Sequence, residues 1–202
     1  NTLVLKNNEI LLNYNKNELT INGNGKLGFE DIYDDINYKI KQKEKQYIFS
    51  TNISLKKNLF LIPLLNYKKK KKSSLSINLN GVYKDNKEIS FNKISLEEDA
   101  NLILVKNLKL NKKLEISKID LVDIYLVNKE KILNELRIER QKKNYRINGK
   151  NFYIKSIINE INNNNTKSNS IFDNLNTNID INISKIYLDT KNFVNNVSGN
   201  II

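Results

Sequence analysis

Apolar and polar residues alternate along most of this chain, from Leu3 to its last residues. The pattern is clearest in three stretches, whose apolar positions are Ile77, Leu79 and Tyr83, then Ile89 and Phe91, then Ile179, Ile181 and Ile183. A period of two is typical of a β-strand that has one face in an apolar environment and the other in water. The pattern therefore predicts a mainly β protein, built as a long antiparallel meander.

Turn signals and breaks divide the predicted strands. The motif Asn22-Gly23-Asn24-Gly25 predicts a hairpin turn, and residues 46–55 predict a further strand. Residues 84–87 predict a tight turn between two strands. The alternation is lost in residues 56–67, which carry the one proline, Pro63, and this predicts a short helix or an irregular cap.

The same pattern predicts the domain organisation of the chain. Residues 1–161 form one β-meander, with the helical insert near 56–67 and a short helix near 153–161. Residues 162–169, NNNNTKSN, are too polar to bury surface and predict a linker. Residues 170–202 then begin a further β-repeat, in which ISKIYL (183–188) echoes ISKIDL (116–121), either as a true repeat or by chance. The missing initiator Met and the apolar end suggest a segment cut from a longer polypeptide.

The composition argues against catalysis. The chain contains no Cys, His, Met or Trp, which removes thiol nucleophiles, imidazole bases and soft metal ligands. No Ser lies in a nucleophile-elbow context. We therefore expect a protein that binds, bridges or scaffolds, with no enzymatic activity, no cofactor and no metal site.

Charge clusters leave other interpretations open. The net charge of +12 and the lysine run 68–72 fit a contact with nucleic acid or a membrane surface. For the lysine run, a charged loop tip is the favoured interpretation. The acidic residues at 97–99 and at 31, 34 and 35 could hold calcium, but turns are favoured because the spacing matches no calcium loop. The aromatic residues are scattered and form no base-stacking platform in the sequence.

The order of elements resembles a known group. The stretches that carry the resemblance are INGNGKLGFEDIYDDINYKI (21–40), LFLIPLL (59–65), LSINLNGVY (75–83), IDLVDIYL (119–126), YRINGKNFYIKSIINEI (145–161) and IDINISKIYLDTKNFVNNVSGNI (179–201). Together they resemble the AsmA-like proteins, the group that includes TamB and YhdP, especially proteobacterial members of the YhdP type. The resemblance covers most of the chain and rests on strand rhythm and phrases such as NVSGNI.

The resemblance implies a long, twisted β-sheet curled into a groove whose apolar interior conducts phospholipid toward the outer membrane. It implies a periplasmic segment of an inner-membrane-anchored protein that reaches both membranes through regions outside this segment, with phospholipid and no nucleic acid as partner. Inward apolar side chains would then hold the acyl chains. The candidates for this lipid groove are Ile77, Leu79, Ile89, Phe91, Ile103, Val105, Ile179, Ile181 and Ile183.

Alternation alone does not distinguish a groove from a closed core. The same apolar face could fill a β-sandwich or a barrel, and by pattern alone the closed core is favoured. Two other functions therefore stay open: a basic nucleic-acid-binding or ribosome-associated domain, and a β-sandwich surface-structural or adhesion module.

Overall fold

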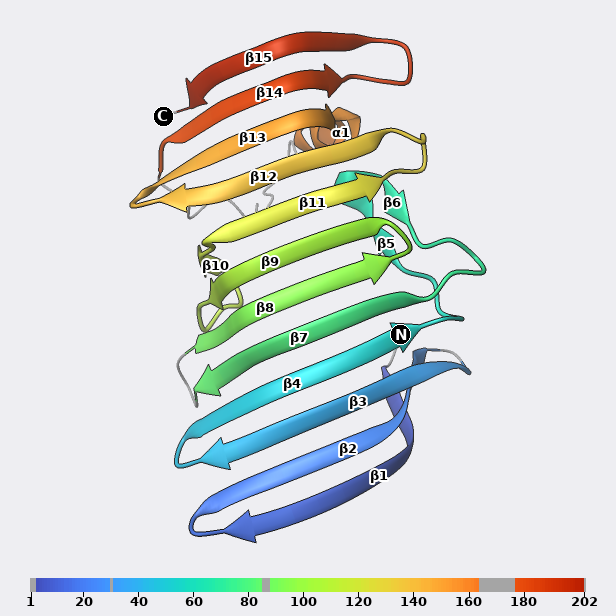
Figure 1. Ribbon diagram of the computed structural model, residues 1–202, viewed down its shortest axis with the longest axis vertical. Coiled ribbons are helices and arrows are strands. Elements are labelled where there is room, and N and C mark those ends of the chain that lie inside the picture. Colours follow the sequence, from blue (N-terminus) through green and yellow to red (C-terminus); the bar gives the residue numbers. More distant parts are fainter. Residues whose placement is uncertain (1–2, 30, 85–87, 164–176, 202) are drawn as a thin grey trace.

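The computed structural model describes residues 3–29, 31–84, 88–163 and 177–201. In this part of the chain the protein is mainly β, with one large mixed sheet that is not closed, one short α-helix and one 3-10 turn (Figure 1). The prediction of a mainly β meander is therefore confirmed. The closed core that the alternation also allowed is not observed.

The elements follow one another in short steps along the chain. They are β1 (Val4–Asn15), β2 (Glu18–Phe29), β3 (Ile32–Lys43), β4 (Gln46–Leu55), β5 (Leu61–Ile62), η1 (Pro63–Leu65), β6 (Tyr67–Lys68), β7 (Leu75–Lys84), β8 (Glu88–Glu98), β9 (Asn101–Leu110), β10 (Ile116–Lys118), β11 (Leu121–Val127), β12 (Leu133–Gln141), β13 (Asn144–Tyr153), α1 (Lys155–Asn163), β14 (Ile179–Tyr187) and β15 (Phe193–Ile201).

The large sheet keeps nearly the order of the sequence. Its strands lie in the order β1-β2-β3-β4-β7-β8-β9-β11-β12-β13-β14-β15, with β10 paired to β9, while β5 and β6 form a small hairpin. Neighbouring strands are antiparallel except β13 and β14, which are parallel. Two parallel neighbours need a long connection, and α1 lies in the stretch between them. This pair is the one departure from the predicted antiparallel meander among the described strands.

The predicted turn at residues 22–25 is wrong, because these residues lie inside β2. The turn instead falls at Lys16 and Asn17, whose φ angles of 43° and 67° suit a two-residue hairpin loop. Gly23 serves close packing, since a Cβ there would lie 2.1 Å from Cζ of Tyr38. The register of β1 on β2 shifts between Lys6 and Glu9, and Figure 1 shows the open end of this hairpin bending behind the sheet.

The predicted helices are found with changed form or bounds. The break at 56–67 contains the β5–β6 hairpin and η1, in which Pro63 stands at the start and Asn66 ends the turn with a φ of 49°. The predicted helix near 153–161 is confirmed as α1, which begins at Lys155. Most of the predicted linker 162–169 and of the predicted turn 84–87 lies outside the described residues. The segment after it adds β14 and β15 to the same sheet.

The two ISK motifs differ in structure. The first begins in β10, a three-residue strand beside β9, and its last residue is the first of β11. The second occupies the latter half of β14 and ends at Leu188, just after the strand. Their likeness in sequence therefore does not correspond to the same position in two structural units.

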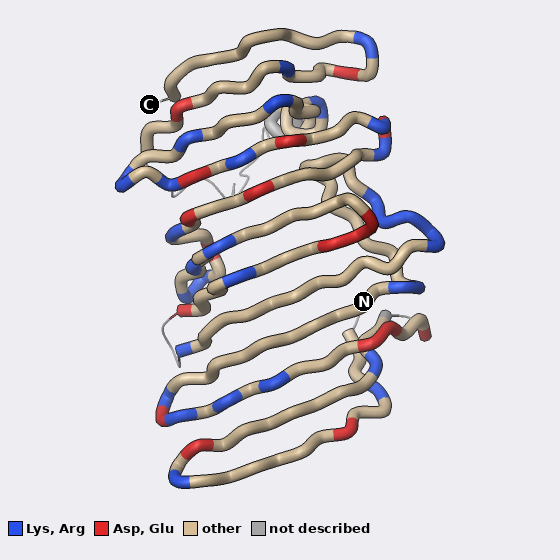
Figure 2. Tube along the Cα trace, viewed as in Figure 1, with Lys and Arg blue, Asp and Glu red and all other residues tan. Residues whose placement is uncertain are grey.

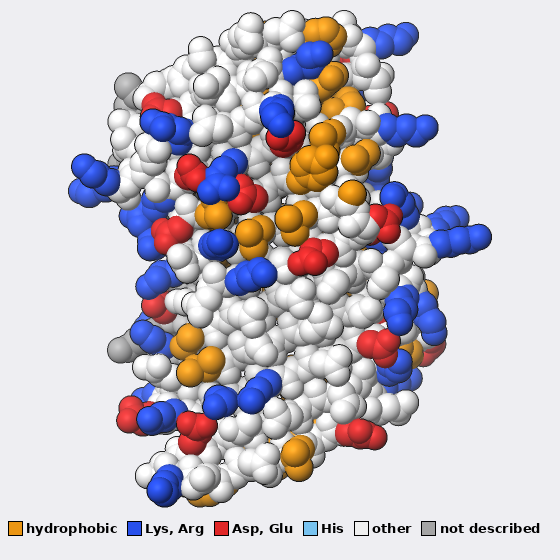
Figure 3. Space-filling model, viewed as in Figure 1, with side chains coloured by type: hydrophobic (Ala, Val, Ile, Leu, Met, Phe, Trp, Pro, Cys, Tyr) orange, Lys and Arg blue, Asp and Glu red, His pale blue; other side chains and the backbone are white. Residues whose placement is uncertain are grey.

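The sheet has one apolar and one mostly polar face. Rows of paired residues on the polar face include the amide and hydroxyl row Asn24, Asn37, Asn52, Asn78 and Ser95. Figure 3 views this face, and Figure 1 shows α1, β5 and β6 behind it, over the apolar face. The buried core cluster on the apolar side comprises Tyr67, Ile103, Ile124, Leu126, Leu136, Phe152, Ile183 and Ile186.

Candidate functional site

The apolar face is continuous across the sheet. Residues that pair across neighbouring strands point to the same side, so a row of partners defines one face. One row extends from β3 to β15 through Ile36, Ile53, Ile77, Leu96, Ile103, Ile124, Leu136, Gly149, Ile183 and Val197. A second row extends from β7 to β14 through Leu79, Ile94, Val105, Val122, Ile138, Ile147 and Ile181.

All nine candidate groove residues lie on this face. Six of them belong to the two rows: Ile77, Ile103, Ile183, Leu79, Val105 and Ile181. The other three lie on the same face because their partners do. Phe91 and Ile89 pair with Gly81 and Tyr83, which follow Leu79 at every second position of β7. Ile179 pairs with Tyr145, two positions before Ile147 in β13. Strand register thus places on one side of one sheet residues that are more than 100 positions apart in the chain.

The nine residues differ in accessibility. Ile103 and Ile183 are only 7% and 4% exposed, because they belong to the packed core cluster. The other seven are half-buried. Among them, Val105 and Ile181 pack against the cluster. The apolar face therefore serves in part as core and in part as accessible surface.

Two segments cover part of the apolar face. The insertion between β4 and β7 contributes Tyr67 to the core cluster and packs Phe60, Ile62 and Leu65 against it. Helix α1 and the residue before it pack Ile157 and Ile154 against the same cluster. In Figure 1 both segments lie behind the same end of the strands.

A third row of the apolar face is accessible. We call this row the open strip; it consists of Ile21, Ile40, Phe49, Phe91 and Leu108, all of them half-buried. The rings of Phe49 and Phe91 meet edge to face, with centroids 5.7 Å apart. Gly81 lies between them, and a Cβ there would be 2.7 Å from Cζ of Phe49. The missing side chain lets the two rings come together over the sheet.

The covering insertion is held by buried charged groups. Glu98, at the end of β8, is 1% exposed and accepts hydrogen bonds from the Tyr67 hydroxyl (2.6 Å), the Lys70 N–H (2.8 Å), Asn101 Nδ2 (3.3 Å) and the Ser73 hydroxyl. Burial acts to raise the pKa of Glu98, but these hydrogen bonds outweigh it and hold the pKa below its ordinary value. The predicted solvated turn at residues 97–99 is therefore wrong for Glu98.

Asp34 holds the start of the insertion in the same way. Its carboxylate accepts hydrogen bonds from the N–H groups of Lys56, Lys57 and Asn58, at 2.8, 2.9 and 2.8 Å. Burial acts to raise the pKa of Asp34, and these hydrogen bonds lower it below its ordinary value. Asp34 lies in β3 and not in a turn, in contrast to the sequence prediction.

The lysine run has one buried member. Lys69 is 4% exposed, and its Nζ donates to the carbonyl oxygens of Lys56, Lys70 and Ser73 at 3.0–3.1 Å. The remainder of the run forms a charged protrusion at one end of the strands (Figure 2). The predicted charged loop tip therefore describes its neighbours and not Lys69, which ties the loop together from inside.

The apolar face reaches both outer strands of the sheet. Ile10 and Leu12 on β1 and Ile201 on β15 are 56%, 61% and 55% exposed. Within the described residues no strand pairs with the outer edge of β1 or of β15. The face is therefore open at both ends of the strand ladder.

The described ranges contain no group of three or more acidic residues placed to hold a metal ion. Neither is any helix there long and apolar enough to cross a bilayer. Comparison of the chain with protein-family models, with curated proteins and with solved structures found no match.

Proposed function

We propose that this chain is a non-enzymatic segment of a bridge-like protein that carries phospholipid between membranes, with acyl chains held on the apolar face. The observation that carries the proposal is a single sheet, not closed, whose apolar side chains line one face from β3 to β15. The resemblance to AsmA-like proteins supports a periplasmic location and contacts with the inner and outer membranes through regions outside this segment.

The dimensions of the sheet suit acyl chains. Neighbouring strands are about 4.8 Å apart, so the twelve strands of the main ladder span on the order of 50 Å. The hydrocarbon core of a bilayer is about 30 Å thick, and one acyl chain fills about half of it. The open strip alone, which crosses the strands from β2 to β9, spans about 24 Å and is therefore long enough for one acyl chain.

The energetics require no specific polar contact. Each methylene group that leaves water contributes about 0.8 kcal/mol, so an acyl chain is retained by contact with the open strip alone. The half-buried rings of Phe49 and Phe91 form part of that contact surface. The polar face meanwhile keeps the sheet in water.

Native mass spectrometry of the protein purified from bacteria tests the proposal. We expect bound phospholipid that resists mild washing. Phe49→Asp places a charge in the open strip and should abolish this binding, whereas Ser50→Asp, one residue along β4 and exposed, should keep it. Circular dichroism confirms that both variants fold. A lipid-free wild-type protein would refute the proposal, and co-purified nucleic acid would favour the basic nucleic-acid-binding alternative.

A further inference from the structure

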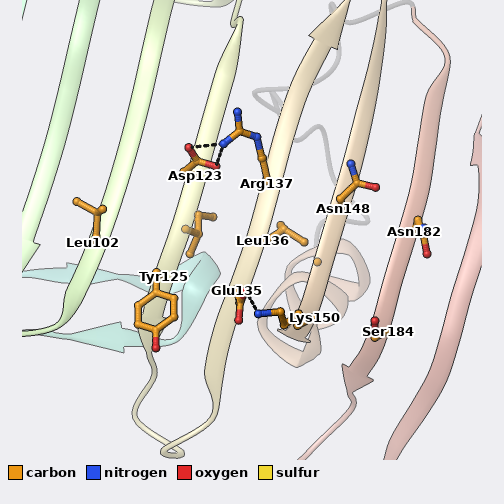
Figure 4. A pocket seen from close by; sticks show the side chains of 12 residues that line it. Leu102, Asp123, Tyr125, Glu135, Leu136, Arg137, Asn148, Lys150, Asn182 and Ser184 are labelled. Carbon is orange, nitrogen blue, oxygen red and sulfur yellow. Dashed lines mark hydrogen bonds and ion pairs between the residues drawn. The ribbon is translucent and has the colours of Figure 1, made fainter.

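The polar face carries a hollow that the proposed lipid function does not use. It has a volume of about 560 Å³ and lies across β9, β11, β12, β13 and β14. Figure 4 shows its lining side chains, and Figure 3 shows an apolar group amid polar surroundings on the same face. The sheet separates this hollow from the open strip, so the hollow can hold a ligand independently of the apolar face.

Irregular pairing gives the hollow its shape. The register of β12 on β13 shifts between Glu135 and Leu136, where β13 carries Lys150 as an extra residue. Next to Lys150, the strand pairing leaves out one residue in each of the two following strands, Ser184 in β14 and Asn196 in β15. Asn196 has a φ of 52°, as expected at such an irregularity. Bulges redirect side chains beside functional sites, and here they place Lys150 and Ser184 in the lining of the hollow.

The apolar part of the lining is exposed. Tyr125 and Leu102 pair with each other across β11 and β9, and they are 46% and 37% exposed. Large apolar side chains in the middle of a polar face form a platform for a flat, partly apolar ligand surface. In Figure 4 the Tyr125 ring lies at one side of the hollow, between Leu102 and Glu135.

The polar part of the lining is balanced in charge. Arg137 pairs with Asp123 at 3.1 Å, and Lys150 pairs with Glu135 at 2.8 Å. Asn148 and Asn182 are neighbours across β13 and β14, and their amides both donate and accept hydrogen bonds. The site therefore offers paired charges and amides instead of a net charge.

We propose that this hollow binds a neutral oligosaccharide. The C–H face of a pyranose ring stacks on Tyr125, and the ring hydroxyls, which donate and accept, meet Asn148, Asn182 and the fixed ion pairs. Asp123 and Glu135 neutralise Arg137 and Lys150 in the same lining, so the hollow has no net positive charge to attract phosphate groups, which disfavours nucleic acid there. The inference is independent of lipid binding on the other face.

Titration calorimetry with the full chain tests this site, with oligomers of β-linked glucose, N-acetylglucosamine and mannose as probes. We expect at least one series to bind with a dissociation constant of about 1 mM or lower. Tyr125→Ala should weaken that binding about tenfold, equivalent to about 1.4 kcal/mol. Asn182→Ala should weaken it as well.

The control is Tyr14→Ala, which removes another exposed tyrosine on β1, outside the hollow, and should leave sugar binding unchanged. Thermal melts verify that all three variants are folded. If no sugar series binds, or if Tyr125→Ala and Tyr14→Ala bind equally, the proposal is overturned. Binding of oligothymidylate that weakens with Tyr125→Ala and with added salt would also overturn it, in favour of a nucleic-acid site.

Discussion

Glu98→Gln removes the charge that holds the covering insertion to the sheet. In the native protein each carboxylate oxygen of Glu98 accepts two hydrogen bonds, Oε1 from Lys70 and Ser73 and Oε2 from Tyr67 and Asn101. A glutamine amide replaces one oxygen by NH₂, so two of the four donors lose their acceptor oxygen in either orientation, and the other two keep only a neutral one. At about 1.5 kcal/mol or more for each bond to a charged group, we expect a loss of about 3 kcal/mol in the free energy of unfolding.

Urea denaturation at pH 7 measures this loss, and for a domain of this size it corresponds to a fall of about 6–12 °C in Tm. Glu97→Gln changes the exposed neighbour and should stay within about 0.5 kcal/mol of wild type.

The pH dependence gives a second test of Glu98. Because its folded-state pKa lies below the ordinary value of 4.5, its contribution to stability is fully present above about pH 4.5. The contribution is lost as the pH falls through the lower, folded-state pKa. The difference between wild type and Glu98→Gln should therefore shrink on acidification. An equal stability at pH 7, or a difference that persists in acid, would refute the reasoning.

Three further substitutions test the packing around the apolar face. Asp34→Asn should cost about 2 kcal/mol in urea denaturation, because it weakens the acceptor for three backbone N–H groups. Asp35→Asn, which breaks only a surface ion pair, should cost less, and equal costs would contradict the anchoring role of Asp34. Gly23→Ala should cost about 1–3 kcal/mol in the free energy of unfolding, because its Cβ meets the ring of Tyr38. Adding Tyr38→Ala should reduce that cost in a double-mutant cycle. Additive effects of the two substitutions would show that this contact does not cause the destabilisation. Lys69→Met should remove the Nζ donor shared by three carbonyl groups and speed proteolysis of the 68–73 loop; unchanged cleavage would argue against its role.

The sequence predicted the sheet well because alternation is a local signal. The predicted strand at residues 46–55 coincides with β4, and the nine candidates read from alternation share one face. The prediction failed where glycine was taken as a turn residue. Gly23 and Gly25 make room for side chains of neighbouring strands, which no local pattern reveals.

The anchors of the insertion were missed for a different reason. The sequence predicted Glu98 and Asp34 as surface carboxylates because their neighbours in sequence are charged, yet most of their partners lie 22–31 positions away. Burial of a carboxylate is tolerated only when hydrogen bonds replace water. The donors to Asp34 are mostly backbone N–H groups, which carry no sequence signature. The donors to Glu98 are mostly side chains, whose approach no local pattern reveals. The hollow around Tyr125 was missed likewise, because it depends on irregular pairing in β13 and β14.

The division of the apolar face into core and open strip follows from these anchors. Ile103 and Phe91 have the same pattern in sequence and lie on the same face, but only Ile103 belongs to the cluster that Tyr67 and its insertion join. What separates a core position from an accessible one is therefore the placement of the insertion, and Asp34 and Glu98 fix that placement from two different strands. A single open sheet needs such a cover for stability, since one uncovered apolar face would leave too little buried surface to offset chain entropy. The open strip is the part of the face that this cover does not reach, which is why stability and ligand access reside on one surface.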